Sequence, residues 1–220
     1  MLSKNALRTI FCVSAAETAV LYLMVSSERG LWCVDLPVAR WAARLPLGLS
    51  SRLARYATQI GSTAGLVGVA TLVVLMEQRR GLGHRVGSYL LVVIASNSAL
   101  VNALKTWLSR DRPHLSPLVR TASSSFPSGH TTSAAATYAC FALLLGRGRS
   151  ELTQWWLVLI AAVVAVAVGA TRVILGVHWL TDVLAGLGLG WASAALLTLL
   201  FAVPLGLETQ PGQDITHEPG

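Results

Sequence analysis

Hydrophobic residues along this chain are gathered into six long blocks that are separated by short polar segments. Each block runs for roughly 16 to 21 residues, which is close to what one helix needs to cross the apolar core of a bilayer. The blocks cover residues 8–26, 60–76, 86–104, 131–146, 155–171 and 183–203. A soluble core divides its apolar residues more finely. The pattern therefore predicts an all-α, polytopic membrane protein with six transmembrane helices.

The two ends of the chain extend this interpretation. The first block follows Lys4 and Arg8 and so resembles a signal peptide, but no small-residue cleavage site is clear before Glu28. We interpret it as a membrane span. Six spans leave little chain for a second domain, so we expect one membrane domain over residues 1–206. The polar residues 207–220 are expected to form a disordered tail.

Composition agrees with a membrane protein and narrows the class of partner. Hydrophobic residues make up 54% of the chain and charged residues 12%, and the formal net charge is +7. The basic residues lie in short loops rather than along one soluble face, so we expect anionic lipid and no nucleic acid as the partner. Arginines in residues 31–59 recur at three- and four-residue steps among Trp and Leu. This spacing is typical of a helix lying in the headgroup layer.

Three polar clusters lie where the predicted spans meet water, and the first is built on two cations. Lys105 ends the third block, and Arg112 follows seven residues later, just before Pro113. An ammonium and a planar guanidinium can converge on one anion. Considered alone, both residues are more typical of ordinary interfacial anchors.

The second cluster lies at the start of the fourth block, where Ser128, Gly129 and His130 follow Pro127. A helix N-terminus offers free backbone N–H groups to a phosphate, and glycine allows close approach. A plain serine N-cap with a glycine turn is the alternative for Ser128. His130 favours function, because an ionisable residue at the mouth of a membrane helix is a candidate site residue.

The third cluster contains Thr171, Arg172, His178 and Asp182. His178 and Asp182 are four residues apart, so on a helix they share a face, and the carboxylate can hold the proton of one ring nitrogen. The other nitrogen is then a nucleophile of fixed tautomer. In the structural alternative, Asp182 caps the sixth span and His178 is a polar loop residue, which leaves Arg172 unexplained.

Together the three clusters resemble the signatures of the type-2 phosphatidate phosphatase (lipid phosphate phosphatase) superfamily, in its bacterial membrane branch. Its first signature is Lys, six residues, Arg-Pro; its second is Pro-Ser-Gly-His; its third is Ser-Arg, five residues, His, three residues, Asp. Thr171 is the single departure, since it replaces serine but keeps a hydroxyl. The six-block layout extends the resemblance over nearly the whole chain.

The resemblance implies a role for each residue and a site at the membrane–water interface. His178 attacks phosphorus, His130 protonates the leaving oxygen, and Asp182 orients His178. Lys105, Arg112 and Arg172, with Ser128 and Gly129, hold the phosphate, and Thr171 is a further candidate. No cofactor is expected. The remaining histidines lack accompanying carboxylates, and Cys12, Cys33 and Cys140 lack ligand spacing, so we expect no metal site.

The expected function is hydrolysis of a lipid monophosphate or diphosphate through a phosphohistidine, in a multi-pass protein of the cytoplasmic (inner) membrane. The count of cations favours a polyprenyl (undecaprenyl) diphosphate, with a phosphatidylglycerophosphate, phosphatidate or lipid A phosphatase as alternatives. A lipid phosphotransferase and a non-enzymatic lipid-phosphate binder stay open, as do the oligomeric state and the role of Glu17. The charge count of the loops opposes a cytoplasmic amino terminus, whereas the resemblance implies an extracytoplasmic site.

Overall fold

The structure is a computed structural model, and it describes residues 3–27, 32–46, 48–115, 117, 118 and 123–201. All regular elements in this part of the chain are helical, as the sequence predicts. The helices are α1 (Lys4–Ser26), α2 (Trp32–Ala43), α3 (Leu49–Ala57), the short 3-10 helix η1 (Thr58–Gly61), α4 (Thr63–Gln78), α5 (Gly83–Leu108), α6 (Gly129–Gly146), α7 (Glu151–Ile174) and α8 (Leu180–Phe201).

Local capping chemistry sets several of the helix ends. The hydroxyl oxygens of Ser3, Ser62 and Ser150 accept a backbone N–H from the first turn of α1, α4 and α7, respectively. At the C-terminal end of α5, Ser109 adopts a left-handed conformation with φ 44°, and its N–H donates to the carbonyl of Lys105. The chain therefore leaves α5 four residues before Pro113.

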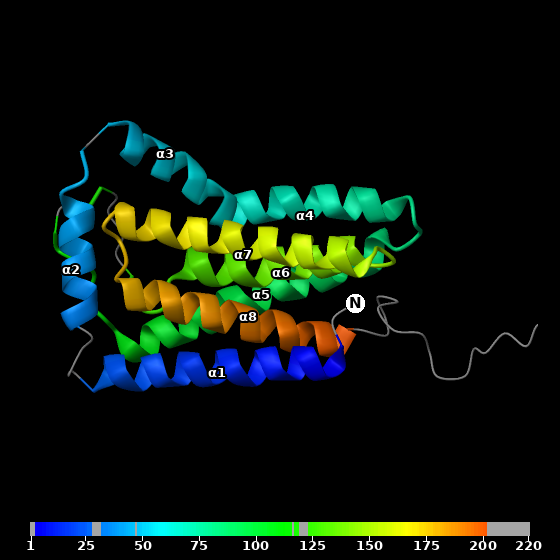
Figure 1. Cartoon of the computed structure of the whole chain (residues 1–220), viewed down its shortest axis with the longest axis horizontal. Coiled ribbons are helices and arrows are strands. Elements are labelled where there is room, and N and C mark those ends of the chain that lie inside the picture. Colours follow the sequence, from blue (N-terminus) through cyan, green and yellow to red (C-terminus); the bar gives the residue numbers. More distant parts are fainter. Residues whose placement is uncertain (1–2, 28–31, 47, 116, 119–122, 202–220) are drawn as a thin grey trace, which may run out of the picture.

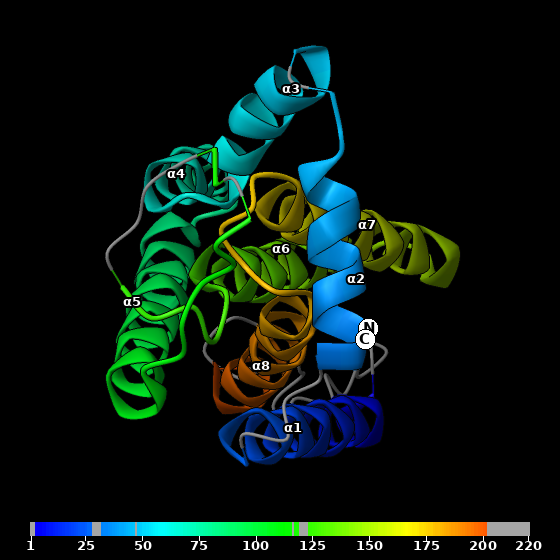
Figure 2. The same ribbon diagram turned by 90° about the vertical axis from the view of Figure 1, so that its left-hand side faces the viewer.

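The long helices form one bundle in which α6 is the central member. It packs against α4, α5, α7 and α8, while α1 lies along α8 (Figures 1 and 2). The end of α5, the start of α6, the end of α7 and the start of α8 all lie at one end of the bundle, and α2 crosses that end (Figure 1). The three polar clusters predicted from the sequence therefore share one end of the molecule.

Small residues allow α6 and α8 to approach closely. A Cβ on Gly190 would lie 2.5 Å from Ala135 Cβ and 2.6 Å from the Thr132 carbonyl oxygen. A Cβ on Gly186 would lie 3.0 Å from the Ser128 carbonyl oxygen. Contacts of this kind fix the helices that carry His130 and Asp182 relative to one another.

The apolar helices support a multi-pass membrane protein. By length and composition α1, α5, α7 and α8 can each cross a membrane, and residues 51–61 and 63–78 add a fifth span if this pair, bent by 54°, counts as one. The central helix α6 is not apolar enough to be counted as a span by this criterion. It is rich in alanine and threonine, and most of its residues are buried against other helices. The predicted count of six spans stays a prediction.

Three sequence predictions, and the open question of Glu17, can be compared with the structure. The helix expected within residues 31–59 is two helices, α2 and α3, because the chain turns at Arg44, Leu45 and Pro46. The tail predicted over residues 207–220 lies outside the described residues, and the single domain over residues 1–206 stays a prediction. Glu17 is exposed, and its carboxylate lies beside Gly188 in α8.

Candidate active site

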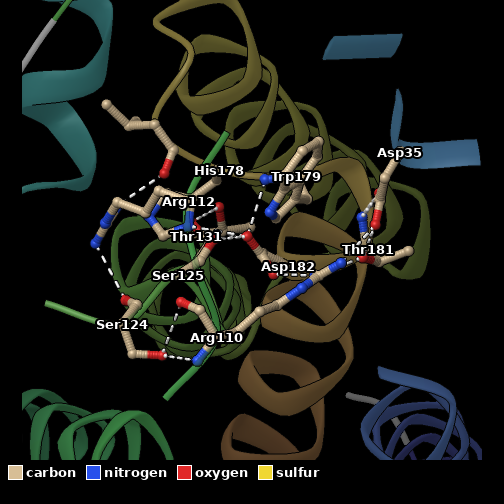
Figure 3. A network of polar contacts seen from close by, with 12 residues as sticks. Asp35, Arg110, Arg112, Ser124, Ser125, Thr131, His178, Trp179, Thr181 and Asp182 are labelled. Carbon is tan, nitrogen blue, oxygen red and sulfur yellow. Dashed lines mark hydrogen bonds and ion pairs between the residues drawn. The ribbon is translucent and has the colours of Figure 1, made fainter. Parts of the chain in front are cut away.

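The candidate site brings side chains of residues 109–115 and 123–128, among them Arg110, Arg112 and Ser125, next to His178 and Asp182 (Figure 3). The two segments are held together by hydrogen bonds, from the Ser125 N–H to the Arg110 carbonyl (2.8 Å) and from the Arg110 N–H to the Ser124 hydroxyl (2.9 Å). The Ser128 N–H donates to the carbonyl of Asp182 at 3.0 Å. The first two clusters are thereby joined to the third.

Arg112 is the contact between the first cluster and the candidate nucleophile. Its Nη1 donates to the carbonyl of Val177 at 2.6 Å and lies 3.3 Å from His178 Nε2. Its Nε and Nη2 donate to the carbonyls of Ser123 and Ser124 at 2.8 and 3.1 Å. Lys105 Nζ also donates to the Ser124 carbonyl, so both cations converge on one loop.

His178 and Asp182 face each other as their spacing predicts. His178 Nδ1 lies 3.4 Å from Asp182 Oδ2, and both side chains are buried. A carboxylate at Nδ1 favours the proton on that nitrogen and leaves the Nε2 lone pair toward Arg112. Burial lowers the pKa of His178 to about 4, although the neighbouring Asp182 acts in the opposite direction. The ring is therefore neutral, and thus nucleophilic, at neutral pH.

The second cluster forms the first turn of α6. Ser128 is the N-cap residue, but its hydroxyl pairs with the Thr131 hydroxyl (2.8 Å) instead of a backbone N–H, so it is not a plain serine cap. A Cβ on Gly129 would meet Val101 Cγ1 at 3.4 Å and no other described atom within 4 Å. The protein itself therefore has room for a side chain at position 129, and a close approach by a ligand remains a reason for glycine there.

His130 lies within reach of the charges of the other two clusters. Burial lowers its pKa to about 4, and the charges of Arg172, His178, Lys105 and Arg112 act in the same direction. A histidine surrounded by cations is neutral until an anion enters among them. The arrangement suits a group that changes protonation when phosphate binds.

Arg172 supplies a third cation at the end of α7. Its Nη1 donates to Thr58 Oγ1 at 3.0 Å, whereas its buried Nε has no hydrogen-bond partner among the described residues. A buried guanidinium N–H without a partner is costly, and a phosphate oxygen would satisfy it. The Thr171 hydroxyl donates to the carbonyl of Val168 at 2.6 Å, so its proton is engaged within α7.

Comparison with known proteins agrees with this geometry. The sequence model of the PAP2 superfamily matches residues 87–203, which is more than half of the chain and includes all three clusters. This chain belongs to the PAP2 superfamily. The motif resemblance drawn from the sequence is thereby confirmed.

Relatives within the PAP2 superfamily carry names of lipid phosphatases. Phosphatidylglycerophosphatase B of Bacillus subtilis (strain 168) is 43% identical over 106 residues, which are 47% of this chain and 52% of that protein. Lipid A 1-phosphatase of Rhizobium johnstonii is 35% identical over 127 residues, which are 53% of this chain and 48% of that protein. The chain thus spans about half the length of the curated relatives it matches.

Solved structures extend the likeness beyond the matched segment. The crystal structure of a transmembrane PAP2 type phosphatidylglycerolphosphate phosphatase from Bacillus subtilis has a TM-score of 0.71 at 27% identity. The match covers 88% of this chain and 94% of that one. Aquifex aeolicus LpxE has a TM-score of 0.57 at 22% identity, with 74% and 94% covered, and shows the shared fold.

The structure adds residues to the candidate site of this PAP2 protein that sequence reasoning missed. Ser125 Oγ and Arg110 Nη1 donate to the Asp182 carboxylate, the latter at 2.5 Å, and Thr58 supports Arg172. Arg110 lies within the first signature and Ser125 just before the second, which was the available signal. Thr58 and Asp35, the latter paired with Arg110, precede the family match and carry no motif.

Proposed function

We propose that this protein is an integral membrane lipid phosphatase that hydrolyses a phosphate or diphosphate headgroup through a phosphohistidine intermediate, without a metal ion. The arrangement of His178 carries the proposal. One ring nitrogen faces the buried carboxylate of Asp182, and the other faces the guanidinium of Arg112 at 3.3 Å. A nucleophilic nitrogen of fixed tautomer beside a cation is what attack on a phosphate requires.

In the first step, the Nε2 lone pair of His178 forms a bond to phosphorus as the bond from phosphorus to the lipid oxygen breaks. The leaving oxygen takes a proton from His130 and departs as part of a lipid alcohol, or as part of a lipid monophosphate if the substrate is a diphosphate. Asp182 stabilises the positive charge that develops on the ring of His178.

In the second step, water attacks phosphorus, and the bond between nitrogen and phosphorus breaks. His130, now neutral, accepts the proton of that water, because the group that gave a proton in the first step can take one back. Inorganic phosphate leaves, and His178 regains its lone pair. No oxidant or co-reactant besides water is needed.

The three cations would neutralise the negative charge of the phosphate during the reaction. Lys105, Arg112 and Arg172 border the His130 and His178 pair, and the free Nε of Arg172 offers one donor to a phosphate oxygen. Charge on the equatorial oxygens must be neutralised through the transition state, and fixed cations can serve in place of a divalent ion. This supports activity that survives chelation.

The names of the relatives and the place of the candidate site support an amphiphilic lipid phosphate as the substrate. A site at the end of a membrane bundle suits an amphiphile whose headgroup enters while its chains stay in the bilayer. The names of the relatives favour phosphatidylglycerophosphate or the 1-phosphate of lipid A. A polyprenyl diphosphate is the second candidate, and the presence of three cations around one site favours it.

The test measures phosphate release by the purified protein in detergent. The substrates are phosphatidylglycerophosphate, phosphatidate, lipid A and undecaprenyl diphosphate, each with excess chelator. We expect release from at least one lipid, and a loss of at least about 10³-fold in His178→Ala, because the covalent step has no substitute. The matched control is His84→Ala, an exposed histidine at the start of α5, which should leave the rate unchanged.

Other outcomes point to other functions. Activity that is lost with chelator and rescued by magnesium would contradict the metal-free mechanism. Phosphate transfer that requires an acceptor lipid would identify a phosphotransferase. Binding of lipid phosphates with no release from any of them would favour a non-enzymatic binder.

A further inference from the structure

Arg110 forms a bridge between two buried carboxylates that lie on different helices. Its Nη1 lies 2.5 Å from Asp182 Oδ1 in α8, and its Nη2 lies 2.7 Å from Asp35 Oδ2 in α2 (Figure 3). Asp182 is 0% and Asp35 1% exposed. A planar guanidinium can hold two carboxylates in fixed directions at once, which a lysine cannot do.

Further contacts hold each member of this bridge in place. Asp35 also accepts the Thr181 N–H at 3.0 Å and the Thr181 hydroxyl at 2.7 Å, so α2 supplies an acceptor to the first turn of α8. Asp182 Oδ2 accepts the Trp179 N–H at 2.8 Å. The Arg110 guanidinium lies 5.7 Å from the centre of the Trp179 ring.

We propose that Arg110 and Asp35 are positioning residues for the His178–Asp182 pair: Arg110 holds the Asp182 carboxylate toward His178, and Asp35 holds Arg110. This inference rests on the proposed function, because it assigns the bridge to the same nucleophile. The proposal assigns neither residue a contact with the phosphate. Arg110 contacts Asp182 through Oδ1, whereas Oδ2 is the oxygen that faces the ring.

The bridge also sets the electrostatic balance at His178. The charged and titratable groups around this ring are Asp182, Arg112, Lys105 and, from α6, His130, while Arg172 of α7 acts on His130 and Lys105. Arg110 partly neutralises Asp182, and Asp35 partly neutralises Arg110. Removing Arg110 therefore favours the protonated ring, and removing the charge of Asp35 disfavours it.

Two substitutions should then have opposite effects on the titration of His178. Arg110→Gln removes a cation beside Asp182, so the pKa of His178 should rise by roughly one unit. Asp35→Asn removes an anion farther away, so the pKa should fall by a few tenths of a unit. The signs differ because one substitution removes a cation and the other an anion. A loss of kcat at unchanged KM in a folded variant is what separates positioning from support of the fold.

The first measurement is an NMR titration of the purified protein in detergent with ¹³C-labelled histidine. The spectrum of His178→Ala assigns the His178 signal. The matched control is Glu77→Gln, which disrupts another buried carboxylate, the partner of Arg80 and Arg147 at the opposite end of the bundle. This control should leave the titration of His178 unchanged.

The second measurement is the steady-state rate of phosphate release. We expect Arg110→Gln to lower kcat by about 10- to 100-fold with KM within about threefold, because the nucleophile is misplaced while the phosphate contacts remain. Arg110→Lys should restore part of kcat, and thermal unfolding in detergent checks that each variant folds. Asp35→Asn should cause no further loss of kcat in the Arg110→Gln background, because Asp35 acts through Arg110.

Three results would overturn the inference. One is a His178 titration that moves in neither variant, another is a shift of the same sign in both, and the third is a raised KM with unchanged kcat in Arg110→Gln, which would make Arg110 a substrate contact. Because the titration needs no turnover, it decides the inference even if the wild-type protein releases no phosphate. Absence of release would contradict the proposed function alone.

Discussion

His130 illustrates how a single residue can depend on its ligand for its chemical role. In the unliganded protein, burial and the surrounding cations lower its pKa to about 4, which is unsuitable for an acid at neutral pH. A bound phosphate brings roughly two negative charges among the same cations, and this raises the pKa of the ring. We therefore expect His130 to take up a proton as the phosphate binds and to be ready to donate it to the leaving oxygen.

This expectation predicts that anions bind more tightly as the pH falls. Below the pKa of His130 in the complex and above its pKa in the free protein, proton uptake should strengthen binding by about tenfold per pH unit. Sulfate is a suitable probe because it stays a dianion in this range. Its inhibition constant should be measured from about pH 8 to about pH 5 in the wild type and in His130→Asn.

The variant should show a weaker pH dependence, and His178 should account for the remainder, since its ring is also neutral in the free protein. His84→Asn is the control, because this exposed histidine lies at the other end of the bundle. An inhibition constant that stays flat with pH in the wild type would contradict proton uptake by His130.

Individual residues also show where sequence reasoning succeeds and where it stops. Lys105, Arg112, His178 and Asp182 could be selected because chemically useful side chains recur at short, regular spacing. Asp35 could not, because its partners Arg110 and Thr181 lie 75 and 146 positions away and the contact depends on how α2 crosses the bundle. The roles of all these residues in catalysis stay predictions.

At the scale of the helices, the contact between α6 and α8 sets the geometry of the site. The start of α6 carries His130, and the start of α8 carries Asp182. Gly190 lies farther along α8, where a Cβ would clash with Ala135 Cβ and with the backbone oxygen of Thr132. Backbone atoms cannot move aside as the tip of a flexible side chain can, so the helices themselves must separate.

Gly190→Ala should therefore lower both stability and activity. Overpacking of this kind costs about 1 to 3 kcal/mol, which should appear as a lower midpoint of thermal unfolding in detergent. Phosphate release should fall with it. Gly87→Ala in α5 is the matched control, since its Cβ would meet Val74 at an ordinary 3.7 Å, and alanine favours the helix. Equal midpoints for the two variants would contradict tight α6–α8 packing as a constraint.

The helices also show which parts of the fold a hydrophobic pattern can predict. The blocks at 86–104, 155–171 and 183–203 lie within or nearly within α5, α7 and α8, because lipid-facing helices need sustained apolar sequence. The break between α2 and α3 was not predicted. Arginines continue at helical spacing through it, and the turn at residues 44–46 depends on how the two helices meet the bundle.

Across the whole molecule, the two ends of the bundle carry different elements and residues. One end carries α2 and the candidate site, and the other carries the connections α4–α5 and α6–α7, with Arg79, Arg80, Arg147 and Arg149 (Figure 1). Arg110, Arg112 and Arg172 at the site end are engaged in the polar network, so they are a poor guide to orientation. We propose that the site end is extracytoplasmic.

An impermeant thiol reagent applied to intact cells tests this orientation. Cys12 and Cys33, which are exposed, are first replaced by serine. Ser123→Cys, at the site end, should then be labelled in intact cells. Arg149→Cys, at the opposite end, should be labelled only after the cells are permeabilised. The reverse pattern would place the site in the cytoplasm and exclude substrates of the outer leaflet.

Two side chains that precede the family match support residues of the candidate site. Thr58, beside the bend between α3 and α4, supports Arg172, and Asp35 supports Arg110. The segment matched by the PAP2 superfamily, residues 87–203, thus carries the candidate reacting groups but not all of the residues that support them. A chimaera that takes its first 86 residues from a relative would exchange much of the surface of the bundle. To keep phosphatase activity, it would still need a hydroxyl at the position of Thr58 and a carboxylate at the position of Asp35.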